Sequence, residues 1–169
     1  MKLIVAVCEG WGIGKDGTQP FFIPEDLKYF KDKTLGKVVV VGRVTFLALP
    51  GAAPLKGRTN IVLTRNKSFD AGGAAICTSS EELLQHLSNY SSDDIFVIGG
   101  RQIYDLLLPY CDTAYVTKIF AKAETDCFFP NIDEMSNWQL HDKSDIKNHD
   151  GINFCFYEYR NTSTQPRFT

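Results

Sequence analysis

Asp26 is an acid in an apolar part of the sequence. Residues 21–23 (Phe-Phe-Ile) precede it, and Leu27 and Phe30 follow it. If a helix begins at Pro24, Leu27 and Phe30 share the face of Asp26. Burial among such side chains raises the pKa of a carboxyl, which suits an acid that takes part in proton chemistry near neutral pH. An acid in a first helical turn also stabilises the helix end electrostatically, and the neighbours alone do not decide between the two roles.

Three apolar segments run directly into glycine. They are Cys8-Glu9-Gly10, Val41-Gly42-Arg43 and Ile98-Gly99-Gly100. In an open parallel sheet such strand ends line one crevice, where ligands bind with phosphates against helix N termini. A single glycine after a strand can equally be a tight turn, but three along one edge favour a ligand site. Neither GxGxxG nor GxxxxGK[ST] occurs, so the sequence predicts neither a standard dinucleotide fold nor a P-loop.

Three arginines accompany the expected strand ends. Arg43 follows the second glycine junction, Arg58 precedes an apolar segment at 59–64, and Arg65 comes directly after that segment. A guanidinium donates two parallel hydrogen bonds that fit carboxylates and phosphates. Most arginines are solvated surface residues, so each one alone carries little weight, but all three are placed to meet an anion.

The histidines and cysteines predict neither a metal site nor acyl-transfer chemistry. His86, His141 and His149 are scattered without ligand spacing, and no serine lies in a GxSxG motif. The five cysteines form no CxxC pair and are odd in number, which argues against a zinc site and against a disulfide framework. Reduced thiols in a cytoplasmic protein fit this pattern best.

The elements that would position these residues alternate between strand and helix. Strands are predicted at 3–8, 38–41, 59–64, 74–77 and 95–98, and helices at 24–35, 43–49, 80–87 and 101–108. Further strands at 114–120, 138–141 and 153–159 follow without intervening helices. We therefore predict an α/β fold with a central, mostly parallel eight-stranded sheet, an antiparallel C-terminal edge strand and helices on both faces.

Length, charge and hydropathy restrict the class of protein. The 169 residues are 44% hydrophobic and suit a single domain, expected over 1–161, with a disordered tail at 162–169. With 18 basic and 20 acidic residues the net charge is -2 and no basic run occurs, which argues against nucleic-acid binding. The first apolar segment is too short for a signal peptide and no segment could span a bilayer, so we expect small-molecule partners and no membrane association.

Several segments together resemble dihydrofolate reductases in order and spacing. They are Ile13-Gly14, residues 20–27 (PFFIPEDL), Phe30-Lys31, residues 41–46 (VGRVTF), Gly57-Arg58 with Asn60, residues 97–100 (VIGG) and Ile103-Tyr104. Residues 128–130 (FFP) and the strand near 154–159 resemble the C-terminal part of the family, so the resemblance spans nearly the whole chain. It implies a monomeric, cytoplasmic, NADPH-dependent oxidoreductase that reduces 7,8-dihydrofolate to tetrahydrofolate for one-carbon metabolism and is inhibited by antifolates.

On the substrate side, the resemblance makes Asp26 the residue that anchors and polarises the pterin, with Phe21 beside the reacting atoms. A carboxylate offers two acceptors to the 2-amino and N3 donors of the pterin. Hydride passes from nicotinamide C4 to pterin C6, and water supplies the proton for N5. Arg58 is expected to pair with the α-carboxylate of the folate glutamate. The other implied substrate contacts are Ile4, Val5, Leu27, Phe30, Leu49, Ile98, Tyr104 and Thr117.

On the cofactor side, the resemblance implies a lid formed by the loop 9–19 and a set of phosphate contacts. Arg43 and Thr45 would meet phosphates at a helix N terminus, and Thr64 with Arg65 would hold the adenosine 2′-phosphate, which predicts a preference for NADPH over NADH. Gly99-Gly100 resembles a cis glycine–glycine peptide of the family. The implied cofactor contacts are Ala6, Ile13, Gly14, Gln19, Gly42, Arg43, Thr45, Leu63, Thr64, Arg65, Gly99, Gly100, Gln102 and Ile103.

Two residues depart from the family pattern, which usually has leucine or methionine before the proline at position 20 and tryptophan after it. Gln19 places a polar amide in the lid, and Phe21 lacks the indole N–H that would hold a water near Asp26. Two alternatives remain, a reductase of the riboflavin pathway on a similar sheet and a non-catalytic folate- or nucleotide-binding module. Asp26 followed by Leu27 and Phe30 favours the folate enzyme over the riboflavin-pathway reductase. Only Gln19 and Phe21 support the non-catalytic binding module.

Overall fold

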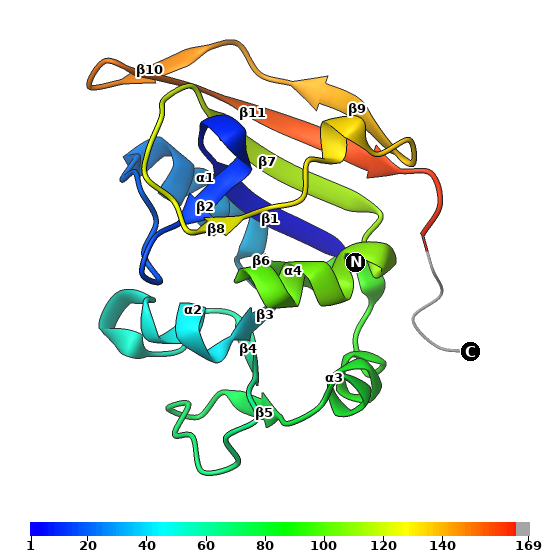
Figure 1. Cartoon of the computed structure of the whole chain (residues 1–169). Helices are drawn as coiled ribbons and strands as arrows, with labels where there is room; N and C mark the ends of the chain where they lie inside the picture. The colour runs from blue at the N-terminus through cyan, green and yellow to red at the C-terminus, as the bar shows by residue number, and fades with distance from the viewer. Residues whose placement is uncertain (165–169) are drawn as a thin grey trace.

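The fold is organised around one large sheet in the computed structural model, which describes residues 1–164. Its strands follow the order β5-β4-β3-β6-β1-β7-β11, and both β9 and β10 pair with β11 at the far edge (Figure 1). The strands are β1 (Lys2–Val7), β3 (Val38–Gly42), β4 (Thr59–Leu63), β5 (Ala75–Cys77), β6 (Ile95–Gly99), β7 (Thr113–Ile119), β9 (Trp138–Lys143), β10 (Lys147–His149) and β11 (Ile152–Asn161).

The direction of the strands confirms the predicted sheet. Every pairing from β5 across to β7 is parallel, whereas β11 is antiparallel to β7. Strands β9 and β10 are antiparallel to successive parts of β11, β10 near its start and β9 near its end, so they share one edge position. The sheet therefore has eight positions across, with antiparallel pairing confined to the C-terminal edge.

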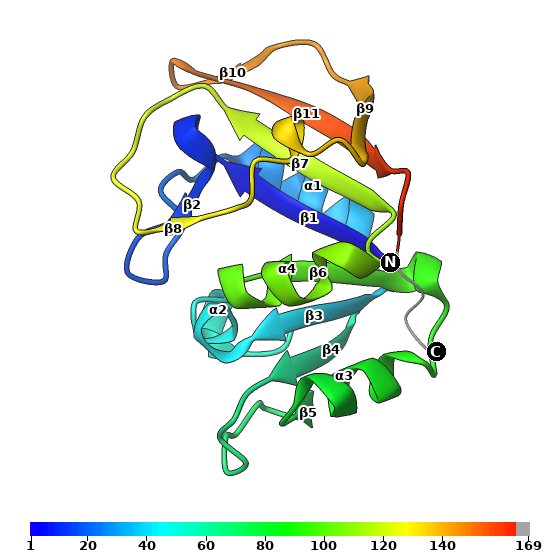
Figure 2. The same ribbon diagram turned by 45° about the vertical axis from the view of Figure 1, so that its right-hand side comes forward.

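Helices cover both faces of this sheet, as predicted. They are α1 (Pro24–Thr34), α2 (Arg43–Leu47), α3 (Ser80–Leu87) and α4 (Arg101–Leu107), with 3₁₀ turns η1 (Glu9–Trp11), η2 (Pro50–Ala52), η3 (Ser92–Asp94), η4 (Leu108–Tyr110) and η5 (Ile132–Glu134). Figure 2 shows α3 and α4 on one face and α1 on the other. The two largest buried clusters lie on opposite faces of the sheet, because successive strand residues point to opposite faces, and a smaller third cluster contains Ile23, Ile119 and Phe154.

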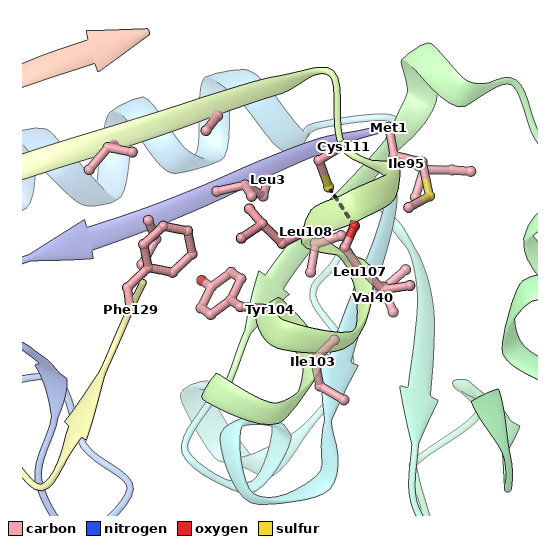
Figure 3. Packing of buried hydrophobic residues seen from close by; sticks show 14 of the residues in the cluster. Met1, Leu3, Val40, Ile95, Ile103, Tyr104, Leu107, Leu108, Cys111 and Phe129 are labelled. Atoms are coloured by element: carbon pink, nitrogen blue, oxygen red, sulfur yellow. Dashed lines mark hydrogen bonds between the residues drawn. The ribbon is translucent and has the colours of Figure 1, made fainter. Parts of the chain in front are cut away.

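The core beneath α4 shows how the sheet and helix are held together. Leu3 of β1 and Leu107 of α4 are fully buried, and Ile103 and Tyr104 lie on the same face of the helix (Figure 3). Removing one leucine side chain of this kind from water contributes roughly 1.5–3 kcal/mol. The buried face of α4 thus fixes the helix whose first residues lie beside the end of β6.

A second, two-stranded sheet was not predicted. It pairs β2 (Gly12–Gly14) with β8 (Cys127–Phe128) and so joins the loop after β1 to a loop that follows β7. Beside it the Asp126 backbone N–H donates to the carbonyl of Gly14 at 3.0 Å, and the Asp16 N–H donates to the Asp126 carboxylate at 3.0 Å. Lys15 and Glu124 form an ion pair across the same two loops. The loop 9–19 is therefore tethered to the rest of the protein.

Two expectations about the whole chain remain as predictions. The tail expected to be disordered, 162–169, falls mainly on residues 165–169, which lie outside the described residues, while the Thr162 N–H donates to the Asn137 carbonyl at 2.8 Å. Within residues 1–164, no helix has both the length and the apolar character needed to cross a membrane.

Candidate functional site

A cavity of about 1240 Å³ lies along the carboxyl ends of the parallel strands. Residues from the ends of β1, β3, β4 and β6 line it, including Ala6, Gly42, Thr64 and Gly99. Two of the three glycine junctions predicted to meet at one crevice therefore do so. The junction at Gly10 does not line this cavity, because the chain turns away through η1 and Gly10 lies at a smaller opening beside Lys122 and Glu124.

The cavity brings together every residue that the resemblance assigns to the cofactor. Three of the residues assigned to the substrate, Val5, Ile98 and Tyr104, also line it. The sequence analysis missed Gly17, Thr18, Val44, Asn66, Thr78, Ser79, Ser80, Arg101, Leu106, Asp126 and Cys127. Residues 78–80 could have been found, since β5 ends at Cys77 on the same edge of the sheet as the other parallel strands.

The glycines at the ends of β3 and β6 let two turns pack closely against each other. A side chain at Gly100 would place its Cβ 2.7 Å from Thr45 Oγ1, and one at Gly42 would lie 3.0 Å from Ile103 Cγ1. Gly99 has a φ of +111°, and its peptide bond to Gly100 is cis, as the resemblance implies. Backbone atoms instead of side chains therefore form this part of the cavity wall, which is what close approach to a ligand requires.

Two cations in the cavity have no acidic partner. Arg43 and Arg65 are exposed and line it, and neither forms an ion pair with any residue in 1–164. Arg101 also lines the cavity, but it is paired with Asp105 at 2.5 Å. Arg43 and Arg65 are thus positioned to bind an anion without first breaking an internal ion pair.

Asp26 lies in the first turn of α1, but its side chain points across to the sheet. The N-cap residue Ile23 provides no side-chain hydrogen bond, and Asp26 Oδ1 accepts a hydrogen bond of 2.5 Å from Thr117 Oγ1 on β7. Burial raises the pKa of the Asp26 carboxyl above its ordinary value, and the hydrogen bond from Thr117 opposes this only in part. The contact with β7 places the acid at the sheet, which favours the chemical role over that of a helix cap.

Several apolar side chains assigned to the substrate do not line the cavity. Phe30 and Leu49 are half-buried against the cluster that contains Ile4, and Phe21 packs against a separate cluster formed by Ile23, Ile119 and Phe154. Leu27 and Phe22 are 44% and 74% exposed. Apolar side chains left open beside a buried acid are what a flat, partly polar ligand can cover.

Arg58 is held in place by neutral hydrogen-bond acceptors. Its guanidinium donates to Thr34 Oγ1 at 3.1 and 3.2 Å, to the Lys56 carbonyl at 2.7 Å and to the Lys31 carbonyl at 3.4 Å. No carboxylate in the described part of the chain pairs with it. Burial lowers the pKa of Arg58, as expected for a cation without a counter-ion. An incoming carboxylate would therefore meet a preoriented and uncompensated charge.

Comparison with known proteins gives one consistent result. Residues 1–161 match the family model described as dihydrofolate reductase. The dihydrofolate reductase of Bacillus subtilis is 39% identical over 160 residues, with 92% of each chain covered, and that of Neisseria meningitidis serogroup A is 35% identical, with 94% of this chain and 96% of the relative covered. A solved structure of dihydrofolate reductase from Enterococcus faecalis, complexed with NADP(H) and RAB-propyl, has a TM-score of 0.84 and 36% identity, with 95% of each chain covered.

Proposed function

The chain belongs to the dihydrofolate reductase family, and we propose that its strand-end cavity holds NADPH while Asp26 binds the pterin of dihydrofolate. The protein is an NADPH-dependent oxidoreductase that reduces dihydrofolate to tetrahydrofolate. The assignment of individual residues within this activity is our proposal. The observation that carries it is the hydrogen bond from Thr117 to the largely buried carboxyl of Asp26, together with a strand-end cavity lined by two arginines that pair with no acid in residues 1–164.

The cavity has the chemistry that a dinucleotide with three phosphate groups requires. Arg43 and Arg65 supply charge that no acid within residues 1–164 neutralises, and the walls at Gly42 and Gly99-Gly100 are backbone. We assign Arg43 with Thr45 to the bridging phosphates, and Arg65 with Thr64 to the 2′-phosphate. Ala6, Ile13 and Gly14 are assigned to the nicotinamide. When bound, NADPH supplies the hydride that passes to pterin C6.

The substrate is recognised by one acid, one arginine and apolar contacts. The Asp26 carboxylate accepts hydrogen bonds from the pterin 2-amino and N3 groups, while Leu27, Phe30 and Leu49 cover its rings. Arg58 binds the glutamate α-carboxylate. Ile4, Val5, Ile98 and Tyr104 are assigned to the junction between pterin and nicotinamide; the Tyr104 hydroxyl donates to the Ile4 carbonyl at 2.8 Å.

Asp26 orients and polarises the pterin, and water supplies the proton for N5. An acid that binds the 2-amino and N3 side of the ring cannot reach N5 directly, so its effect is electrostatic. The raised pKa allows the Asp26 carboxyl to hold a proton near neutral pH more readily than an exposed acid does. Phe21 stands in place of the tryptophan usual in the family and packs against the cluster of Ile23, Ile119 and Phe154, where its ring helps to exclude bulk water.

We also propose that the chain acts as a cytoplasmic monomer that binds antifolates and no nucleic acid. The net charge of -2 without a basic run supports the last point. Five unpaired cysteines support a reducing compartment.

The deciding experiment follows NADPH oxidation with and without dihydrofolate. We expect oxidation that depends on dihydrofolate and yields tetrahydrofolate. A riboflavin-pathway reductase would oxidise NADPH only with its own pyrimidine substrate. A binding module would bind both ligands tightly without turnover, and either result would contradict the proposal.

A further inference from the structure

Lys118 lies in a cage of aromatic rings on the face of β7 opposite to that of Thr117 and Asp26. Its ammonium is 4.8 Å from the centre of the Trp11 ring, 4.6 Å from that of Tyr157 and 5.4 Å from that of Tyr159. Only 18% of the Lys118 side chain is exposed. Cations over ring faces are attracted more strongly when they are withdrawn from water, so this contact is more than incidental packing.

Asp133 fixes the ammonium within the cage. Its carboxylate accepts a hydrogen bond from Lys118 Nζ at 2.6 Å and a second from the Tyr159 hydroxyl at 2.6 Å. Burial alone would raise the pKa of the Asp133 carboxyl, but these two hydrogen bonds together with the charge of Lys118 outweigh burial, and the net shift is downward. Lys118 is thus tied to η5 on one side and to the aromatic rings on the other.

Trp11 is the member of the cage that leads to the cofactor cavity. Its φ of 64° is in the left-handed region, which is unfavourable for a residue with a large side chain, so surrounding contacts must hold it there. Its carbonyl accepts the Phe129 N–H at 2.8 Å, and its ring stacks on Phe129 with a centroid distance of 6.2 Å. The Trp11 N–H donates to the Cys8 carbonyl at 3.0 Å, and Lys118 adds a further contact at the ring.

The turn at Trp11 sets the course of β2. The next residues, Gly12–Gly14, include Ile13 and Gly14 of the cavity wall. Phe129 in turn lies edge-on to the Tyr104 ring, 5.0 Å between centroids, within the core of Figure 3. The position of Trp11 is therefore coupled through short contacts to residues on both sides of the cavity.

We infer that Lys118 is a positioning residue for NADPH, because its cage holds Trp11 in the turn that places Ile13 and Gly14 against the cofactor. The inference rests on the proposed location of NADPH in this cavity. Lys118 itself touches neither substrate nor cofactor in this account. Its loss should therefore weaken NADPH binding while leaving the binding of dihydrofolate unchanged.

The test uses Lys118→Met, which keeps the length of the side chain and removes its charge. The substitution is made in a Trp138→Phe background, so that Trp11 is the one remaining tryptophan and its fluorescence can be measured alone. The buried Trp138 Nε1 has no hydrogen-bond partner within residues 1–164, so the change to phenylalanine removes no hydrogen bond. We expect Kd and KM for NADPH to rise roughly threefold to tenfold. The emission of Trp11 should move to longer wavelength, and KM for dihydrofolate should stay constant.

Two variants show that the charge in the cage is responsible. Lys118→Arg keeps a cation that can contact rings and pair with Asp133, so it should restore NADPH affinity. Lys143→Met removes an ammonium that lies 5.8 Å from the Tyr157 ring without contacting Trp11, so it should have no effect. If Lys118→Met does not fold, the double variant Lys118→Met/Asp133→Asn removes the unpaired acid and provides the same readout.

The outcomes separate the inference from the function on which it rests. If Lys118→Met changes neither the affinity for NADPH nor the emission of Trp11, the positioning role is wrong. It is also wrong if Lys118→Met weakens the binding of NADPH and of dihydrofolate equally and Lys118→Arg does not restore either affinity. If the parent protein does not bind NADPH, the assignment of the cavity is wrong. Trp11→Leu should reproduce the NADPH defect if Lys118 acts through that ring.

Discussion

The two halves of the proposed binding site offer different groups to their ligands. The half proposed for the cofactor is built from the ends of β1, β3, β4 and β6, with backbone walls and two arginines that pair with no acid in the described part of the chain. The substrate half is built from α1 and its neighbours, with one buried acid and apolar side chains that remain as much as 74% exposed. One half provides distributed charge, and the other concentrates its polarity in Asp26 and Arg58.

This difference predicts which single substitutions should have the largest effect on binding and turnover. Recognition spread over several backbone groups and cations loses only a fraction of its binding when one contact is removed. Recognition that depends on one acid has no substitute for it.

Asp26→Asn should abolish most turnover and leave NADPH binding intact. Asparagine keeps an oxygen that can accept the Thr117 hydrogen bond, but it cannot carry the charge that polarises the pterin. We expect the rate of dihydrofolate reduction to fall by about 10²- to 10⁴-fold. Single-turnover rates and NADPH titration measure the two effects separately. Turnover near that of the parent would remove Asp26 from its assigned role.

Arg58→Gln should weaken dihydrofolate binding by roughly tenfold to a hundredfold, the loss expected for charge-assisted hydrogen bonds to a carboxylate. The effect should appear in KM for dihydrofolate. A dihydropteridine that lacks the glutamate is the matched control, since its KM should not change. Lys56→Gln removes a neighbouring exposed cation and should have little effect. If KM rose equally for dihydrofolate and for the dihydropteridine without the glutamate, Arg58 would act only by holding the end of α1.

Arg65→Ala should narrow the preference for NADPH over NADH by roughly tenfold, because the 2′-phosphate is the group that distinguishes the two cofactors. The ratio of kcat/KM for the two cofactors is the measurement. Lys67→Ala is the control, since Lys67 is an exposed cation two residues further on that does not line the cavity. An unchanged ratio in Arg65→Ala would place the 2′-phosphate elsewhere.

Elements with a local sequence signal were predicted, whereas elements defined by distant pairing were not. Each strand of the parallel part was predicted within about two residues of its observed bounds, and the helix at 80–87 with its observed bounds, because long apolar runs and helix-start signals are local. Strands β2, β8 and β10 were missed. They have two or three residues each, and pairing with distant segments defines them, which no local pattern records.

The residues of the site also differ in whether a local sequence pattern could predict them. The cofactor half could be predicted as a crevice because parallel strands end at one edge, and residues 78–80 follow from the same rule. Asp126 and Cys127 could not, since β8 reaches the cavity only by pairing with β2. On the substrate side, Thr117 meets Asp26 across a separation of 91 residues. The family resemblance named both residues as substrate contacts, but neither it nor any local pattern predicted the hydrogen bond between them.

The smallest effect expected is a gain of stability in Asp26→Asn. Burial raises the folded-state pKa of Asp26 above its ordinary value of 3.8. The stabilising contribution of the protonated acid is fully present below the unfolded pKa and is lost as pH rises through the folded pKa. Asparagine does not ionise, so the variant should match the parent in acid and exceed its Tm by roughly a few degrees above the folded pKa.

Thermal unfolding of ligand-free protein across a pH series measures this gain. Asp32→Asn is the matched control, because Asp32 is an exposed acid on the same helix, paired with Lys28 at 2.5 Å, and its replacement should give no gain that grows with pH. A lower Tm in Asp26→Asn at high pH would mean that the buried charge is stabilised by its surroundings. The substrate half would then resemble the cofactor half in sharing its polar contacts among several groups, instead of concentrating them on one acid.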